Sequence, residues 1–70
     1  MTPAEIKQWR ASLGLSQRAA ADALGVTLPT YQAWERGHNL QTKQPLPDKI
    51  MRRAAMHIRE FQEQNKMPTA

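Results

Sequence analysis

The sequence contains no cysteine and only two histidines, His38 and His57. A disulfide framework and a cysteine-based zinc site are therefore excluded, and two widely spaced histidines are too few for a self-contained metal site. No metal and no cofactor is expected. Long apolar runs are also missing, since no stretch approaches the roughly 20 residues of a membrane-spanning helix, and the first residues lack the basic and apolar regions of a signal peptide. These absences predict a cytoplasmic protein without a membrane partner.

Catalytic groups are scarce as well. Six carboxylates are scattered along the chain, and neither a cysteine nucleophile nor a glycine-rich phosphate loop is present. An enzyme is therefore not expected. Seventy residues suffice for one domain, and because a core of this size supplies only about 3–5 kcal/mol, stabilisation by a partner subunit would be useful.

The chain does have an excess of positive charge. Ten Lys and Arg against six Asp and Glu give a net charge of +4, which favours a polyanionic partner. The cations concentrate over residues 36–59, which contain one acid, Asp48. The six cations there are Arg36, Lys43, Lys49, Arg52, Arg53 and Arg59. Charge alone fits a solvated helix face equally well.

Helical periodicity dominates, and no alternating strand pattern occurs. Thr2 can cap a first helix that begins at Pro3 and ends at Gly14. Four of its positions recur at helical spacing: Ile6, Trp9, Arg10 and Leu13. Residues 16–37 predict two further short helices, each with a capping side chain before it and a glycine after it: Ser16 and Gly25, then Thr27 and Gly37.

The second half of the chain predicts a loop and one longer helix. Residues 37–46 have turn chemistry without periodicity. A last helix is expected over 47–66, where an apolar stripe recurs every three or four residues: Ile50, Met51, Ala54, Ala55, Ile58 and Phe61. Residues 67–70 are expected to fray. The predicted fold class is therefore all-α, with a single domain over residues 1–66.

Two short helices joined by a glycine-containing turn are the signature of a helix-turn-helix. Its residues follow in order as Ser16-Gln17, Ala21, Leu24-Gly25-Val26-Thr27, Tyr31 and Trp34-Glu35-Arg36-Gly37. In these residues the chain resembles the Cro/C1-type (XRE) helix-turn-helix family over residues 5–37. The resemblance implies a lambda-repressor-like bundle of four or five helices with a longer C-terminal helix, and DNA binding. A helical hairpin without a DNA role is the alternative, because the same positions serve core and turn.

The family pattern also bears on the core. The family usually has Leu where this chain has Ala20, which removes volume that neighbouring side chains must fill. The resemblance further implies a structural ion pair between Arg10 and Glu35, which would join the first helix to the end of the third. Arg10 shares a helix face with Ile6 and Leu13, so its head is expected to be partly buried and to need an anion. A plain surface charge is the alternative.

The second helix of such a motif lies in the major groove, with its N-terminal residues at base edges. Gln32 suits adenine and Thr30 can bond several edges, but most neighbouring side chains are apolar, so DNA shape is expected to share the readout. A solvated Gln32 is the alternative. The residues expected to read bases are Leu28, Pro29, Thr30, Gln32, Ala33 and Arg36. Those expected to contact phosphates are Gln17, Arg18, Thr27 and Lys43.

The stripe of the last helix extends beyond what a three-helix body needs. A two-fold homodimer through Ile58, Phe61 and their neighbours would cover its outer end and place two reading helices about 34 Å apart on a palindromic operator. Alternatively, the stripe completes the core of one chain. The predicted function is that of a transcriptional regulator that binds double-stranded DNA, with a protein-binding adaptor as the competing function. The size suits a repressor or autorepressor of a phage or mobile-element operon, an antitoxin-type regulator or a regulator of an anti-CRISPR operon.

Overall fold

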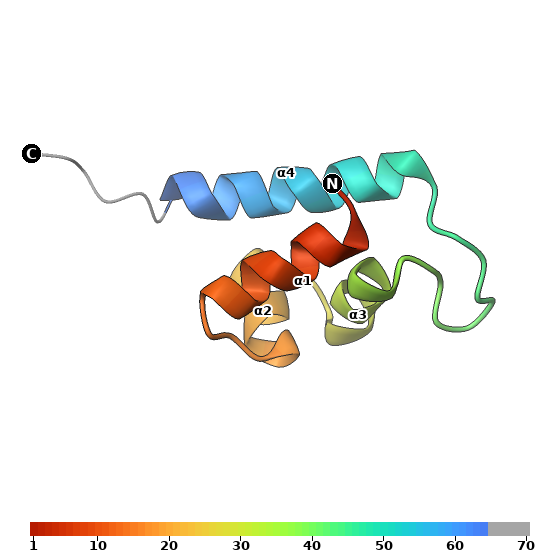
Figure 1. Cartoon of the computed structure of the whole chain (residues 1–70), viewed down its shortest axis with the longest axis horizontal. Coiled ribbons are helices and arrows are strands. Elements are labelled where there is room, and N and C mark those ends of the chain that lie inside the picture. The colour runs from red at the N-terminus through yellow and green to blue at the C-terminus, as the bar shows by residue number, and fades with distance from the viewer. Residues whose placement is uncertain (65–70) are drawn as a thin grey trace, which may run out of the picture.

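The computed structural model describes residues 1–64, which form four helices (Figure 1): α1 (Pro3–Ser12), α2 (Gln17–Leu24), α3 (Leu28–Arg36) and α4 (Asp48–Gln64). Over this range no strand forms, apart from an isolated antiparallel bridge between His38 and Pro45. The predicted all-α fold class is confirmed. The last helix begins at Asp48, one residue later than predicted, and its predicted end at residue 66 and the tail 67–70 lie outside the described residues.

A capping box begins α1. The Glu5 backbone N–H donates to Thr2 Oγ1 at 3.2 Å, and the Thr2 backbone N–H donates to Glu5 Oε1 at 3.1 Å. The prediction for the other end of α1 was wrong in one detail, since Leu13 is 47% exposed instead of buried. The helix ends at Ser12 and the chain turns away, so Leu15 takes the place against the core.

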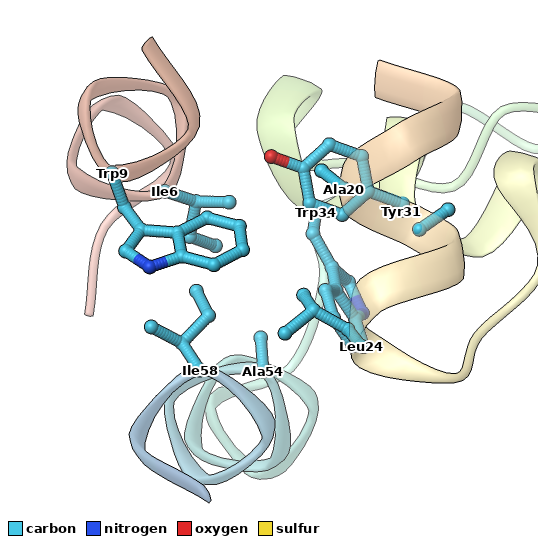
Figure 2. Packing of buried hydrophobic residues seen from close by; sticks show 9 residues of the cluster. Ile6, Trp9, Ala20, Leu24, Tyr31, Trp34, Ala54 and Ile58 are labelled. Carbon is cyan, nitrogen blue, oxygen red and sulfur yellow. The ribbon is translucent and has the colours of Figure 1, made fainter. Parts of the chain in front are cut away.

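The core lies between α4 and the other three helices. Figure 2 shows Ala54 and Ile58 of α4 pointing toward the buried side chains of α1, α2 and α3. Two ring contacts add to this packing: Trp9 meets Phe61 edge to face at a centroid distance of 5.5 Å, and Trp34 lies 5.6 Å from the ring of His57. The buried apolar residues are Ile6, Trp9, Ala20, Ala21, Leu24, Tyr31, Trp34, Ala54 and Ile58.

Ala20 is completely buried within this cluster, as is Tyr31. The smaller side chain at this position therefore does not open the core to solvent. Ala21 is also buried, at 1% exposure. Two successive small residues allow α2 to pack closely against its neighbours.

The arrangement of α3 and α4 around this core determines which surfaces face solvent. Helix α3 points Tyr31 and Trp34 inward, and α4 points Ala54 and Ile58 inward toward the same cluster. The solvent-facing sides of the two helices therefore lie on opposite sides of the domain, with α4 along one side and α3 beneath it (Figure 1).

Candidate nucleic-acid interface

The turn between α2 and α3 is fixed by local interactions. Gly25 ends α2 in the left-handed conformation, with a φ of 72°, which glycine adopts without steric cost. Ser16 Oγ accepts a hydrogen bond from the Ala19 N–H at 3.1 Å at the start of α2. At the start of α3, Thr27 Oγ1 accepts from the Thr30 N–H at 3.4 Å and donates to Thr30 Oγ1 at 2.8 Å. Both helices thus begin with a capped end, but α3 leaves only the Leu28 backbone N–H there, because Pro29 has no N–H and Thr30 donates to Thr27.

The side of α3 opposite Tyr31 and Trp34 is open to solvent. Pro29 and Arg36 are exposed and Ala33 is partly exposed, and these three residues form one row along the helix. Gln32 lies on the side of this row that faces α2, where it bonds to Gln17. We call this surface the outer face of α3; it consists of Leu28, Pro29, Thr30, Gln32, Ala33 and Arg36.

A carboxylate with four hydrogen-bond donors lies behind this face. Glu35 Oε2 accepts from Arg10 Nε at 2.6 Å and from the Tyr31 hydroxyl at 2.5 Å. Glu35 Oε1 accepts from Arg10 Nη2 at 3.2 Å and from Gln17 Nε2 at 3.1 Å. The side chains of Arg10 and Glu35 are 18% and 5% exposed, and Arg10 Nη1 also donates to the Leu15 carbonyl at 3.0 Å. This cluster connects α1, α2 and α3 through one acidic group.

The same contacts set the ionisation of the cluster. Burial raises the pKa of Glu35, but the hydrogen bonds from Arg10, Tyr31 and Gln17 outweigh burial and hold that pKa below its ordinary value. The pKa of Arg10 is raised, first by its hydrogen bond to Glu35. Burial, and then the hydrogen bond to Glu35, raise the pKa of the Tyr31 hydroxyl. At neutral pH the cluster therefore holds an ionised pair and a neutral phenol.

Gln17 connects Glu35 to Gln32 on the outer face of α3 through two hydrogen bonds. A carboxylate can only accept hydrogen bonds, so the amide nitrogen of Gln17 faces Glu35 and its Oε1 faces the other way. There Gln17 Oε1 accepts from Gln32 Nε2 at 3.3 Å. Sequence reasoning placed Gln17 and Gln32 in separate roles and did not predict this bond. The identity of the residues gave no signal for it, because the contact depends on how α2 crosses α3.

The connection between α3 and α4 is an ordered loop. Asn39 Oδ1 accepts from the N–H groups of Gln41 at 2.8 Å and Thr42 at 3.0 Å, and the Asn39 N–H donates to the Gln44 carbonyl at 2.8 Å. Lys43 at the turn has a φ of 61°. Turn chemistry predicted a loop here, but sequence reasoning missed the role of Asn39 in folding it.

A groove of about 560 Å³ separates this loop from α3. Pro29, Thr30 and Ala33 form one wall, and the loop, including Leu40 and Thr42, forms the other. None of the described residues that line it is ionisable. The loop therefore lies beside the outer face of α3, where a molecule bound to that face would meet both.

All of the residues predicted to read bases or contact phosphates are at least partly exposed. Gln17 and Arg18 lie at the start of α2, Thr27 precedes α3, and Lys43 lies in the loop. The expected dimer surface is different. Ile58 is 1% exposed because it completes the core of its own chain, so a second chain cannot use its side chain without opening that core. Phe61 is half-buried against Trp9.

Comparisons with known proteins agree with this geometry. A family model described as helix-turn-helix matches residues 6–46, which is more than half of the chain and covers the Glu35 cluster, the outer face of α3 and most of the loop. No curated protein and no solved structure matches the chain. Among residues 1–64, no helix has the length and apolar character needed to span a membrane.

Proposed function

This chain belongs to the Cro/C1-type helix-turn-helix family of DNA-binding regulators, and from that membership we propose that it binds a specific double-stranded DNA operator and represses transcription there. The outer face of α3 carries the proposal. Tyr31 and Trp34 hold the helix in the core while the opposite row faces solvent. A helix held in this way can enter the major groove while the domain stays folded.

Gln32 is the side chain on this face best suited to read a base. One of its amide hydrogens is used by Gln17, which leaves the other amide hydrogen and the carbonyl oxygen for a partner. Adenine offers the matching pair, an acceptor at N7 beside a donor at N6. We therefore expect Gln32→Ala to cost about 1–3 kcal/mol of discrimination at one A·T pair. Gln17→Ala should relax the same preference, because the amide is then no longer oriented.

The other residues of the outer face have different chemistry. Leu28, Pro29 and Ala33 offer apolar contact, most naturally to thymine methyl groups, and Thr30 adds a hydroxyl. Arg36, at the end of α3, can reach a base edge or a phosphate. With so few hydrogen-bonding groups, sequence-dependent DNA shape contributes part of the specificity.

Phosphate contacts come from the edges of this surface. Gln17 and Arg18 begin α2, and at the start of α3 the Leu28 backbone N–H suits an anion, whereas Pro29 has no N–H and Thr30 donates to Thr27. Lys43 extends the contact from the loop across the groove. Because each phosphate neutralised by a Lys or Arg releases counterions, the two cations among these contacts, Arg18 and Lys43, would reduce affinity about 12-fold between roughly 50 and 200 mM salt.

A homodimer on a palindromic operator fits this mode of binding, with two reading helices about 34 Å apart. The interface proposed here keeps the half-buried Phe61 at the end of α4 and leaves out Ile58, which the core already uses. Sedimentation at micromolar concentration tests this directly. A species of about 8 kDa alone, with no pairing on DNA, would contradict the dimer.

The regulated gene is proposed to be the chain's own operon. We propose control through the regulator's own concentration, as in an autorepressor of a phage or mobile element, an antitoxin-type regulator or a regulator of an anti-CRISPR operon. Footprinting of the DNA upstream of its gene tests this proposal. A palindromic protected site supports it, and the absence of protection supports a protein-binding adaptor on the same fold.

A matched pair of variants identifies the surface involved. Arg36→Gln and Lys7→Gln each remove one exposed cation, but Arg36 lies on the outer face of α3 whereas Lys7 lies on α1. Arg36→Gln should weaken operator binding and reduce the salt slope by about one. Lys7→Gln should leave both nearly unchanged. Equal effects of the two substitutions would mean that net charge, and not the outer face of α3, governs binding.

A further inference from the structure

The solvent-facing side of α4 carries a row of cations. Arg52 and Met56 each lie two residues from Ala54, a rotation of about 200° that turns them away from the core. Lys49 and Arg59 extend the same row, and Arg53 flanks it. We call these five residues the outer face of α4. Residues 49–59 contain four Lys or Arg and no acid: Lys49, Arg52, Arg53 and Arg59.

Asp48, four residues before Arg52, and Glu60, four residues after Met56, lie on or beside this face, so its cations are only partly compensated within the helix. Arg59 pairs with Glu63 at 3.6 Å in a solvent-exposed contact, but among residues 1–64 no carboxylate pairs with Lys49, Arg52 or Arg53. Lys49 is three and four residues from Arg52 and Arg53, the spacings at which like charges on a helix repel. It also lies in the first turn of α4, where the helix dipole disfavours a cation. An external anion would relieve both penalties.

Beyond the first turn of α4, whose Ile50 lines the same groove as Pro29 and Ala33, the outer face of α4 is separated from the outer face of α3 by the core of the domain. The two shorter dimensions of the molecule are 22 and 19 Å, and the inward residues of both helices meet in one cluster. A straight duplex held by α3 in its major groove would therefore leave Arg52, Arg53 and Arg59, which lie beyond the first turn of α4, without contact to that duplex. An anion bound there belongs to another molecule or to a distant segment of the same DNA.

The chemistry of this face suits phosphates better than a protein. Met56, 62% exposed, is its only large apolar side chain, whereas protein interfaces centre on buried aromatic and aliphatic anchors. A second copy of this chain would bring like charges together. Guanidinium groups spaced along one helix instead match a line of phosphates, which needs no apolar contact.

We propose that the outer face of α4 binds the phosphate backbone of a second DNA segment, without regard to its sequence, while the outer face of α3 holds the operator. The inference rests on the proposed operator binding for the first segment only. It makes the chain a bridge between two DNA segments and gives Arg52 and Arg53 a ligand.

The test uses the full chain and two short duplexes. A donor-labelled operator duplex and an acceptor-labelled duplex of unrelated sequence are mixed with the protein, and energy transfer reports that both are held together. Operator binding is measured separately by gel shift. Three phosphate contacts predict that capture of the second duplex falls about 40-fold between roughly 50 and 200 mM salt.

Three variants decide the result. Arg52→Gln with Arg53→Gln should reduce capture of the second duplex about tenfold and leave operator binding within about twofold. The charge-preserving pair Arg52→Lys with Arg53→Lys should retain capture. Lys7→Gln is a single-charge control, because it removes one exposed cation from α1, outside the outer face of α4, and it should leave capture of the second duplex nearly unchanged.

The contrary outcomes are distinct. If the wild-type protein captures no second duplex at about 50 mM salt, or if the Arg52 and Arg53 double variant captures it as well as wild type does, the proposal is wrong. If the double variant loses operator binding in proportion, α4 touches the same duplex and the proposal is also wrong. Failure of the wild-type protein to shift the operator contradicts the proposed function instead, because that measurement does not involve the second duplex.

Discussion

Glu35→Ala should lower the free energy of unfolding by about 3 kcal/mol. The substitution removes the shared acceptor of Arg10, Tyr31 and Gln17. Breaking a buried ion pair by deleting one partner typically costs about 3–5 kcal/mol. The lower end applies here, because Arg10 stays 18% exposed and keeps its hydrogen bond to the Leu15 carbonyl. For a domain of this size such a loss lowers the melting temperature by about 12–24 °C.

The chain supplies a matched control for this measurement. Glu63 pairs with Arg59 at 3.6 Å, but these side chains are 68% and 80% exposed. Exposed pairs contribute about 0–1 kcal/mol, so Glu63→Ala should shift the melting temperature by only a few degrees. Thermal melts followed by circular dichroism compare the two variants, starting near 5 °C because Glu35→Ala approaches the total stability of a small core. Equal melting temperatures would refute the reasoning that burial of Glu35 matters.

Three further predictions concern pH and backbone conformation. The lowered pKa of Glu35 contributes stability above its unfolded value near 4.5 that disappears as the pH falls through the folded pKa, so the urea midpoint should drop in acid, and Glu35→Gln should flatten that drop. The raised pKa of Tyr31 contributes stability that is complete below its unfolded value near 10.0 and is lost at higher pH; Tyr31→Phe should remove this alkaline loss, and an unchanged alkaline profile would argue against it. Gly37→Ala should cost more than Gly25→Ala in urea unfolding. Both glycines have positive φ, a conformation that costs alanine about 1–2 kcal/mol relative to glycine. Only at Gly37 would the new Cβ also come within 2.9 Å of Pro3. Equal losses of stability in the two variants would contradict that clash.

The parts of the fold that were predictable from sequence are those that depend on neighbouring residues. Thr2, Ser16 and Thr27 cap helices through contacts three residues away, and Gly25 ends α2 through its own backbone conformation. Such signals are visible in the printed sequence because both partners lie within one helical turn. The first three helices and the turn that places α3 followed from them, whereas α4 was predicted from the spacing of its apolar residues.

The sequence-based predictions were wrong or incomplete for residues whose position depends on contacts between different helices. Periodicity placed Leu13 on the buried face, but α1 ends one residue before it and Leu15 packs in its stead. Periodicity also placed Ile58 in the apolar stripe of the last helix, but it did not indicate whether its own chain or a second chain would bury the side chain. The bond between Gln17 and Gln32 depends on the crossing of α2 and α3, and no local pattern encodes that crossing. Side-chain roles at the candidate site were therefore less predictable than the elements that hold them.

The Glu35 cluster connects stability and recognition within one set of side chains. Glu35 neutralises Arg10 behind the interface and, by accepting from Gln17, fixes which end of that amide faces Gln32. Because an amide that is free to rotate can present either donors or an acceptor, this order removes one of the two arrangements before DNA arrives. The adenine selectivity proposed for Gln32 then depends on a carboxylate that is not expected to touch a base. Substitutions at Arg10 or Glu35 that leave the chain folded should consequently alter base preference at a position that neither residue contacts.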